Sequence, residues 1–194
     1  MKAKISEENS KLGKLPNISL TPIKSCTNCS YCKTDCYAMK SYRMYPSVKN
    51  AWDHNFNLYK ENPAVYFQSI NIYLTKKRPR FFRWHVAGDI PDQRYLTGMI
   101  NISKKHSRTT FLAFTKNFKL NYSNVPKNLS IVFSMWVGMK KPRHKKGVSG
   151  FAWFQDGTEK RIPNQAIKCP GHCDNCGMCF NISKIGGHVV FYKH

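Results

Sequence analysis

All eight cysteines of this 194-residue chain lie in two short runs, and this clustering constrains the fold more than any other feature of the sequence. The first run has the spacing C-x2-C-x2-C-x3-C, and the second has the reversed spacing C-x3-C-x2-C-x2-C. The members of the two runs are Cys26, Cys29, Cys32 and Cys36, then Cys169, Cys173, Cys176 and Cys179. Cysteines used only as small buried residues would be scattered, so the two runs predict ligation or cross-linking.

Iron–sulfur chemistry fits this spacing best. Three cysteines at successive x2 spacings place three sulfurs on one small loop, which suits a cubane whose irons each take one thiolate. The first spacing is also that of bacterial ferredoxins, in which proline follows the fourth cysteine; here Tyr37 follows Cys36, but Pro170 follows Cys169. Zinc is the alternative, because it takes four thiolate or imidazole ligands and His172 and His188 lie near the second run.

The number of [4Fe–4S] clusters, one or two, stays open at this point. Each run has enough thiols for a cluster of its own, and a single cluster with spare cysteines is a further alternative. If instead the runs share ligands, the N- and C-terminal cysteine segments meet at one metal centre. A shared centre would stabilise the fold, because its loss would free both ends of the chain.

The second run also begins with the C-x3-C-x2-C spacing of radical S-adenosylmethionine enzymes, in which three cysteines leave one iron open to the cofactor. The segment from Cys32 to Met39 has the same spacing with methionine in the third position. Two features argue against this interpretation. Asn175 stands where those enzymes have an aromatic residue, and Cys179 supplies a fourth thiol that would close the open iron.

Charge gives a second strong signal, because 32 Lys and Arg against 10 Asp and Glu leave a net charge of +22. Such a balance favours polyanions, and nucleic acid first among them. The most basic loop contains Lys140, Lys141, Arg143, Lys145 and Lys146. Charge alone carries no sequence readout and also serves solubility, so nucleic-acid binding with a structural iron–sulfur or zinc centre is an alternative function.

The length predicts a single domain over residues 1–194. No run of about 18 apolar residues appears, so we predict no membrane span. The first residues lack the apolar core of a signal peptide, so we expect the host-cell cytoplasm, where clustered thiols bind metal more often than they form disulfides. Within the domain we expect a polar arm at 1–20, an N-terminal cysteine segment at 21–40, an α/β core at 41–160 and a C-terminal cysteine segment at 165–182.

The core predicts an α/β fold with a mostly parallel sheet, or an incomplete (β/α) barrel. Helices are expected to begin at Pro46, at Pro63 and near Pro91. The expected strands are 81–87, 109–115, 129–136, 150–154 and 189–192. These strands are almost continuously apolar, as strands covered on both faces are, and strands that alternate with helices favour right-handed crossovers.

Polar residues follow the first two of these strands. His85 and Asp89 end the first, and Lys116 follows the second. Because ligands gather at the carboxyl ends of parallel strands, these three residues are candidates for acid–base catalysis or anion binding in a pocket beside the cluster. The alternative is that His85 is a buried core residue and that Asp89 caps the helix beginning near Pro91.

Several of these motifs together resemble the phage gene-product-88 family. The residues that carry the resemblance are Ser25-Cys26, Cys32-Lys-Thr-Asp-Cys36-Tyr-Ala, Phe82-Arg-Trp-His-Val-Ala-Gly-Asp89, Phe114-Thr-Lys-Asn117 and the second cysteine run. The resemblance implies a viral origin and a cysteine-ligated centre of the iron–sulfur type, and it supplies no reaction. We therefore predict a phage-encoded iron–sulfur protein in electron transfer or a redox reaction, with its status as an enzyme left open.

Overall fold

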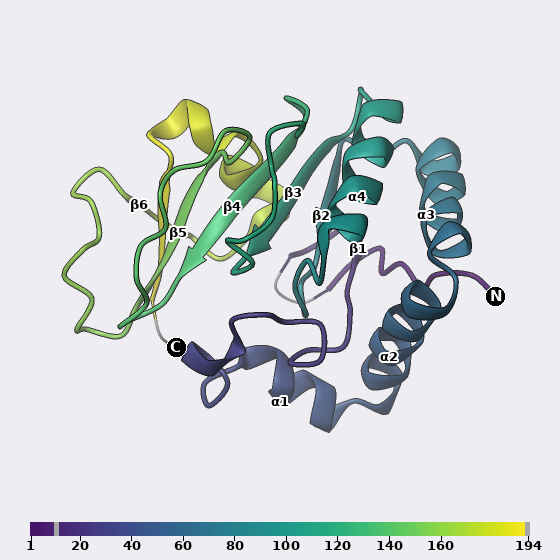
Figure 1. Ribbon diagram of the computed structural model, residues 1–194, viewed down its shortest axis with the longest axis horizontal. Helices are drawn as coiled ribbons and strands as arrows, with labels where there is room; N and C mark the ends of the chain where they lie inside the picture. The colour runs from purple at the N-terminus through teal and green to yellow at the C-terminus, as the bar shows by residue number, and fades with distance from the viewer. Residues whose placement is uncertain (10–11, 193–194) are drawn as a thin grey trace.

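A seven-stranded, all-parallel sheet forms the centre of the computed structural model, which describes residues 1–9 and 12–192 (Figure 1). The strand order is β1-β2-β3-β4-β5-β7-β6, with β1 and β6 at the two open edges. The strands are β1 (Asn17–Ile18), β2 (Phe81–Trp84), β3 (Thr110–Thr115), β4 (Leu129–Met135), β5 (Gly150–Gln155), β6 (Ile167–Lys168) and β7 (His188–Tyr192). The prediction of a mostly parallel α/β sheet is confirmed, and the sheet does not close into a barrel.

Three of the helices, α2, α3 and α4, begin where proline and capping residues predict. They are α1 (Tyr37–Met44), α2 (Pro46–Glu61), α3 (Pro63–Lys77), α4 (Gln93–Lys105) and the one-turn α5 (Cys173–Cys176), with 3-10 helices η1 (Cys29–Tyr31) and η2 (Met178–Ile185). Proline stands at the start of α2 and α3, where its fixed φ suits a helix and its missing N–H costs nothing. The N-terminal cap of α4 is Asp92 rather than Asp89. The Asp92 carboxylate accepts a hydrogen bond from the Tyr95 amide at 2.8 Å.

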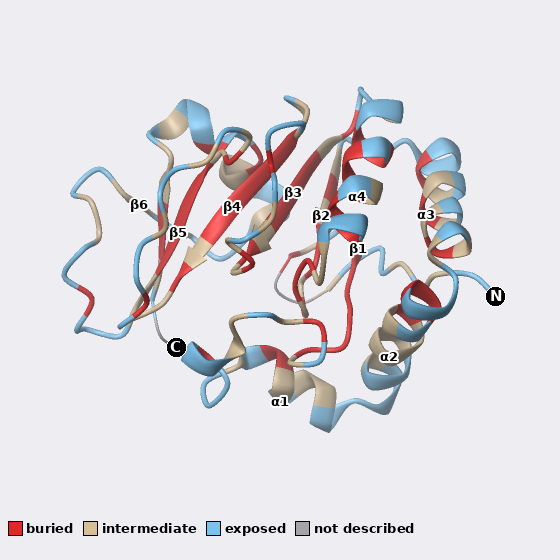
Figure 2. Ribbon diagram, viewed as in Figure 1, coloured by how far each residue is buried: buried red, intermediate tan, exposed pale blue. Residues whose placement is uncertain are grey.

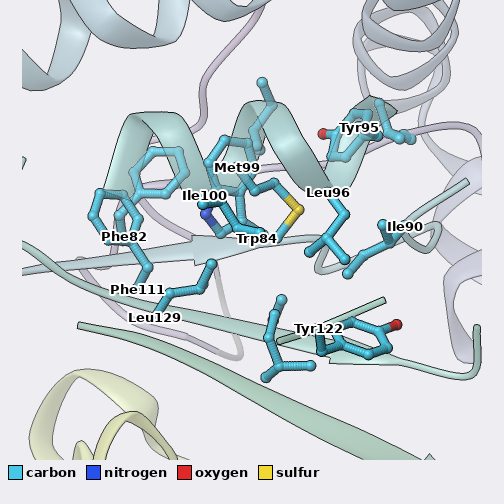
Figure 3. Packing of buried hydrophobic residues seen from close by; sticks show 14 of the residues in the cluster. Phe82, Trp84, Ile90, Tyr95, Leu96, Met99, Ile100, Phe111, Tyr122 and Leu129 are labelled. Atoms are coloured by element: carbon cyan, nitrogen blue, oxygen red, sulfur yellow. The ribbon is translucent and has the colours of Figure 1, made fainter. Parts of the chain in front are cut away.

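One face of the sheet is covered by α2, α3 and α4. Figure 3 shows Phe82 and Trp84 of β2 and Phe111 of β3 packed against Leu96 and Met99 of α4. All five side chains are completely buried, and they belong to the larger of two apolar clusters. The helical layer is therefore the main hydrophobic core.

The opposite face of the sheet is covered by the two ends of the chain. Leu112 and Val132 point to this side, where they pack against Leu12 and against Phe180 and Ile182 of η2. In Figures 1 and 2 the C-terminal segment lies behind strands that are buried along most of their length. Burial from both sides explains the near-continuous apolar character of the strands.

Two boundaries differ from the sequence prediction. The strand expected over 81–87 ends at Trp84, because His85 adopts a left-handed backbone conformation with φ +56° that does not continue a strand. Part of the segment expected to be a polar arm is packed into the fold, because Leu12 and Leu15 are buried and residues 17–18 pair with β2.

Candidate functional site

The first cysteine run follows β1 and lies at the carboxyl edge of the sheet. Its loop is fixed to the segment that follows β2, because the Ser25 hydroxyl donates to the Thr21 carbonyl at 2.7 Å and accepts from the Asp89 amide at 3.3 Å. Gly88 is required at this contact. Its φ is +82°, and an added Cβ would lie 2.5 Å from the Ser25 hydroxyl oxygen.

Two further hydrogen bonds anchor the run to neighbouring loops. The Asn28 amide group donates to the Lys116 carbonyl after β3, and the Tyr37 hydroxyl donates to the Val86 carbonyl after β2. The cysteines of the first run therefore lie where the carboxyl ends of β1, β2 and β3 meet. Ligand sites of parallel α/β proteins commonly occupy this edge.

The thiols of this run share a partly buried environment with one lysine. Burial and the nearby Asp89 carboxylate together raise the pKa of Cys26 to about 12, although the Lys116 ammonium acts in the opposite direction. Burial also raises the pKa of Cys29 and of Cys32, and the Lys116 charge again acts in the opposite direction. Lys116 thus offsets negative charge on all three of these sulfurs, and Lys33 acts in the same direction at Cys29.

Of the three polar residues predicted after the strands, Asp89 and Lys116 lie together. Asp89 is buried and accepts from the backbone amides of Ile90 at 2.6 Å and Lys116 at 2.8 Å. Burial raises the pKa of Asp89, while the Thr115 hydroxyl and the Lys116 charge lower it. Burial lowers the pKa of Lys116, but Cys32 and Asp89 outweigh this effect and the net shift is upward.

His85 lies apart from this pair. Its ring is 3% exposed and packs 5.2 Å, centroid to centroid, from Tyr95 of α4. Neither ring nitrogen has a hydrogen-bond partner in the described part of the chain, so His85 does not pair with Asp89. Burial, together with the Arg83 charge, lowers the pKa of His85 to about 3 and keeps the imidazole neutral. The structure thus places His85 as the alternative interpretation expected, in the core.

The second cysteine run crosses the sheet face opposite α2–α4. It starts beside β7, where the Cys169 amide donates to the Val190 carbonyl at 2.9 Å. The Asp174 amide then donates to the Leu12 carbonyl at 3.1 Å, which ties α5 to the N-terminal segment. Cys173 and other thiols of the run pack against the apolar cluster on this face. The two ends of the chain therefore meet, although the two cysteine runs occupy different places.

Arg83 of β2 is the cation of the second run. Its guanidinium Nη1 lies 3.9 Å from the Cys173 sulfur, and its guanidinium carbon lies 4.9 Å from the centroid of the Phe114 ring. Burial raises the pKa of Cys179 to about 12 and also raises that of Cys169, and Arg83 opposes both shifts. Sequence reasoning missed Arg83, although a lone cation in an apolar strand, facing away from Phe82 and Trp84, is a usable signal.

The thiols form two separate sets. The neighbouring cysteines whose charge raises the pKa of Cys29 and Cys32 all belong to the first run. The neighbouring cysteines that raise the pKa of Cys169 and Cys179 all belong to the second run. All eight thiols are free. Across residues 1–9 and 12–192, no three His, Cys, Asp or Glu side chains converge closely enough to hold a metal ion. Meeting of the two runs at one metal centre is therefore not confirmed.

The histidines near the second run contribute less to a donor set than the cysteines. His188 Nδ1 accepts from the Trp153 indole N–H at 3.2 Å, and its ring stacks on Phe151 at 5.6 Å. His172 is exposed. The candidate donors of the site are therefore the cysteine thiols, four in each run.

A polar cavity of about 260 Å³ lies beside the second run. Its walls are Arg80, Phe81, Asp174, Asn175, Cys176, Gly177, Met178 and Asn181. This cavity gives solvent access to Cys176, whereas the pocket expected from sequence was placed beside Asp89 and Lys116. Among the described residues, no helix is both long and apolar enough to cross a membrane.

Comparison with known proteins gives one match. The family model described as Gene product 88 matches residues 1–146, which cover the first cysteine run and the sheet as far as β4. No curated protein and no solved structure matches the chain.

Proposed function

We propose that this chain, which belongs to the phage Gene product 88 family, is an iron–sulfur protein that takes part in electron transfer or a redox reaction. The observation that carries the proposal is the division of the thiols into two sets, each with its own cation. We infer two [4Fe–4S] centres, one held by Cys26, Cys29, Cys32 and Cys36, the other by Cys169, Cys173, Cys176 and Cys179. A bound [4Fe–4S] cluster would supply a one-electron redox couple.

The chain supports such centres through its own charges. Four thiolates in a partly buried site repel one another, and a fixed cation lowers the cost of holding them ionised. Lys116 does this for the first run, and Arg83 does it for the second. Hydrogen bonds and positive charge near cluster sulfurs also raise the reduction potential, so these two residues would tune the two centres separately.

The test is metal and sulfide content after anaerobic purification of the full chain. Two centres predict about eight iron and eight sulfide per chain, and one centre predicts about half of each. The matched variants Cys32→Ser and Cys173→Ser should each lose about half of the iron, because each removes one ligand set. If the runs share one cluster, either variant loses nearly all of it. Zinc without sulfide would refute the iron–sulfur proposal.

A further inference from the structure

Four of the large apolar side chains that the structure leaves most exposed lie within one short stretch. Tyr31, Tyr37, Met44 and Tyr45 are 47, 54, 56 and 52% exposed. Met1, Ile72 and Tyr192 are exposed elsewhere on the molecule, but they are scattered. Tyrosine has much to gain from burial, so the exposure of Tyr31 and Tyr45 is notable, whereas the Tyr37 hydroxyl is held by the Val86 carbonyl. We call this region, together with Lys33, Lys40, Arg43 and Lys49, the α1 surface.

Helix geometry places the two of these side chains that belong to α1 on one side of it, whereas Tyr31 lies in η1 and Tyr45 follows the last residue of α1. Tyr37 and Met44 are seven residues apart, which is close to two full turns, and Lys40 lies between them on the same side. The opposite side is held against the protein, because Ala38 is buried and the Tyr42 hydroxyl donates to the Asp53 carboxylate at 2.8 Å. Figures 1 and 2 show α1 at the lower margin of the molecule, with exposed residues along its outer side.

The α1 surface is also basic. Its four cations are all exposed, and Asp35 is the one acidic residue between positions 31 and 49 of the sequence. Lys49 is the cation that faces Asp53, at 4.0 Å, so Lys33, Lys40 and Arg43 dominate the charge beside the tyrosines. Exposed tyrosine rings interleaved with cations are the combination that binds unpaired bases and their phosphates.

We propose that the α1 surface binds single-stranded nucleic acid, with bases stacked on Tyr45 and its neighbouring tyrosines and with phosphates at Lys40 and Arg43. A duplex keeps its base faces stacked internally and could use the cations alone. A membrane-binding helix would need a strongly apolar face, whereas the outer side of α1 carries Lys40 between Tyr37 and Met44. The α1 surface contains none of the eight cysteines of the proposed centres, although Tyr31 and Tyr37 are sequence neighbours of Cys32 and Cys36.

The basic loop at 140–146 fits this ligand less well. The Lys141 ammonium lies over the rings of Phe151 at 5.0 Å and Trp153 at 5.6 Å, and the Lys145 ammonium donates to the Leu120 carbonyl at 3.1 Å. Two of its five cations therefore contact the protein itself. The loop also contains no tyrosine, phenylalanine or tryptophan on which a base could stack.

The first experiment measures fluorescence anisotropy of labelled dT and rU oligonucleotides of about 12 nucleotides, with a duplex of the same length for comparison. The anaerobically purified full chain should bind both single strands more tightly than the duplex. Tyr45→Ala should weaken single-strand binding about fivefold or more, and Tyr45→Phe, which keeps the ring, should not. Equal binding of duplex and single strand, or equal affinity of the two Tyr45 variants, overturns the proposal.

The second experiment separates this surface from general basicity. Lys40→Ala with Arg43→Ala should reduce the slope of log K against log salt by about 0.7 for each cation removed. A matched control, Lys76→Ala with Lys104→Ala, removes the same charge near the far ends of α3 and α4 and should leave the slope nearly unchanged. The proposal is contradicted if the two pairs of substitutions have equal effects. It is also contradicted if binding is lost only on removal of Lys140 and Lys146, or if the protein prefers anionic vesicles. Iron content, measured on the same samples, reports on the metal centres separately.

Discussion

Replacing Arg83 by glutamine should lower the reduction potential of one proposed centre and leave the other unchanged. The guanidinium Nη1 lies 3.9 Å from the Cys173 sulfur, and its charge opposes the raised pKa values of Cys169 and Cys179. Glutamine keeps part of the side-chain volume and removes the charge. The reduced centre gains negative charge, so loss of the cation disfavours the reduced form more than the oxidised one.

The size of the shift follows from Coulomb's law. Two unit charges about 4 Å apart interact by about 4 kcal/mol at an effective dielectric constant of 20. The charge of the added electron would be spread over the whole cluster, and Arg83 is partly exposed to solvent, so we expect an interaction of only about 1 kcal/mol. This energy corresponds to a fall of about 40 mV in the potential of a one-electron couple.

The assay is a potentiometric titration followed by electron paramagnetic resonance, in the wild type and in Cys32→Ser and Cys173→Ser proteins that retain one centre each. Lys116→Gln is the matched variant, because Lys116 stands beside Cys32 as Arg83 stands beside Cys173. Each cation variant should shift one centre alone. Unchanged potentials, or equal shifts of both centres by either variant, would refute this reasoning.

Three further predictions concern the scaffold, all measured by urea unfolding of anaerobically prepared protein. In the folded protein the pKa of His85 is about 3, whereas in the unfolded chain it is 6.5. As the pH drops, the unfolded chain therefore takes up a proton first and the stability of the wild type falls. His85→Asn removes this group and should flatten the pH dependence of stability. That difference in pKa amounts to about 3 kcal/mol between pH 7 and pH 4, and identical profiles would contradict it. Gly150→Ala should cost about 1–3 kcal/mol, because its Cβ would lie 2.3 Å from the Gly187 carbonyl oxygen, and unaltered stability would exclude this clash. Trp84→Ala should cost about 3–5 kcal/mol, since the indole is completely buried; a loss below about 1 kcal/mol would contradict the packing.

The sequence predicts much of the scaffold because its signals are local. Proline sets the starts of α2 and α3, and continuous apolar runs indicate strands buried on both faces. The end of β2 is different. Nothing in the segment Trp84-His85-Val86 indicates that His85 takes a φ of +56°, because positive φ is uncommon for any residue other than glycine.

The candidate site is predictable in its residue types but not in its arrangement. Cysteine spacing identifies both runs, and the rule of strand ends predicts that His85, Asp89 and Lys116 lie together, whereas only Asp89 and Lys116 do. The second run lies on the sheet face opposite the helices because of contacts with Leu12 and β3, more than 50 residues away in either case. Such long-range packing has no local signature, and neither does the pairing of Arg83 with Cys173.

The α1 surface and the first cysteine run are continuous in sequence and in space, and this proximity makes a final prediction. Tyr31 precedes Cys32 and Tyr37 follows Cys36, so a bound polyanion would lie beside the first centre. Negative charge near a centre disfavours its reduction, and linkage requires the same free energy to appear as weaker binding to the reduced protein. A tenfold affinity difference corresponds to about 59 mV. Saturation with dT oligonucleotide should therefore lower the first potential and leave the second in place, and the Lys40→Ala, Arg43→Ala protein should lose that shift. Equal movement of both potentials would show that the ligand acts through the net charge of the protein rather than at α1.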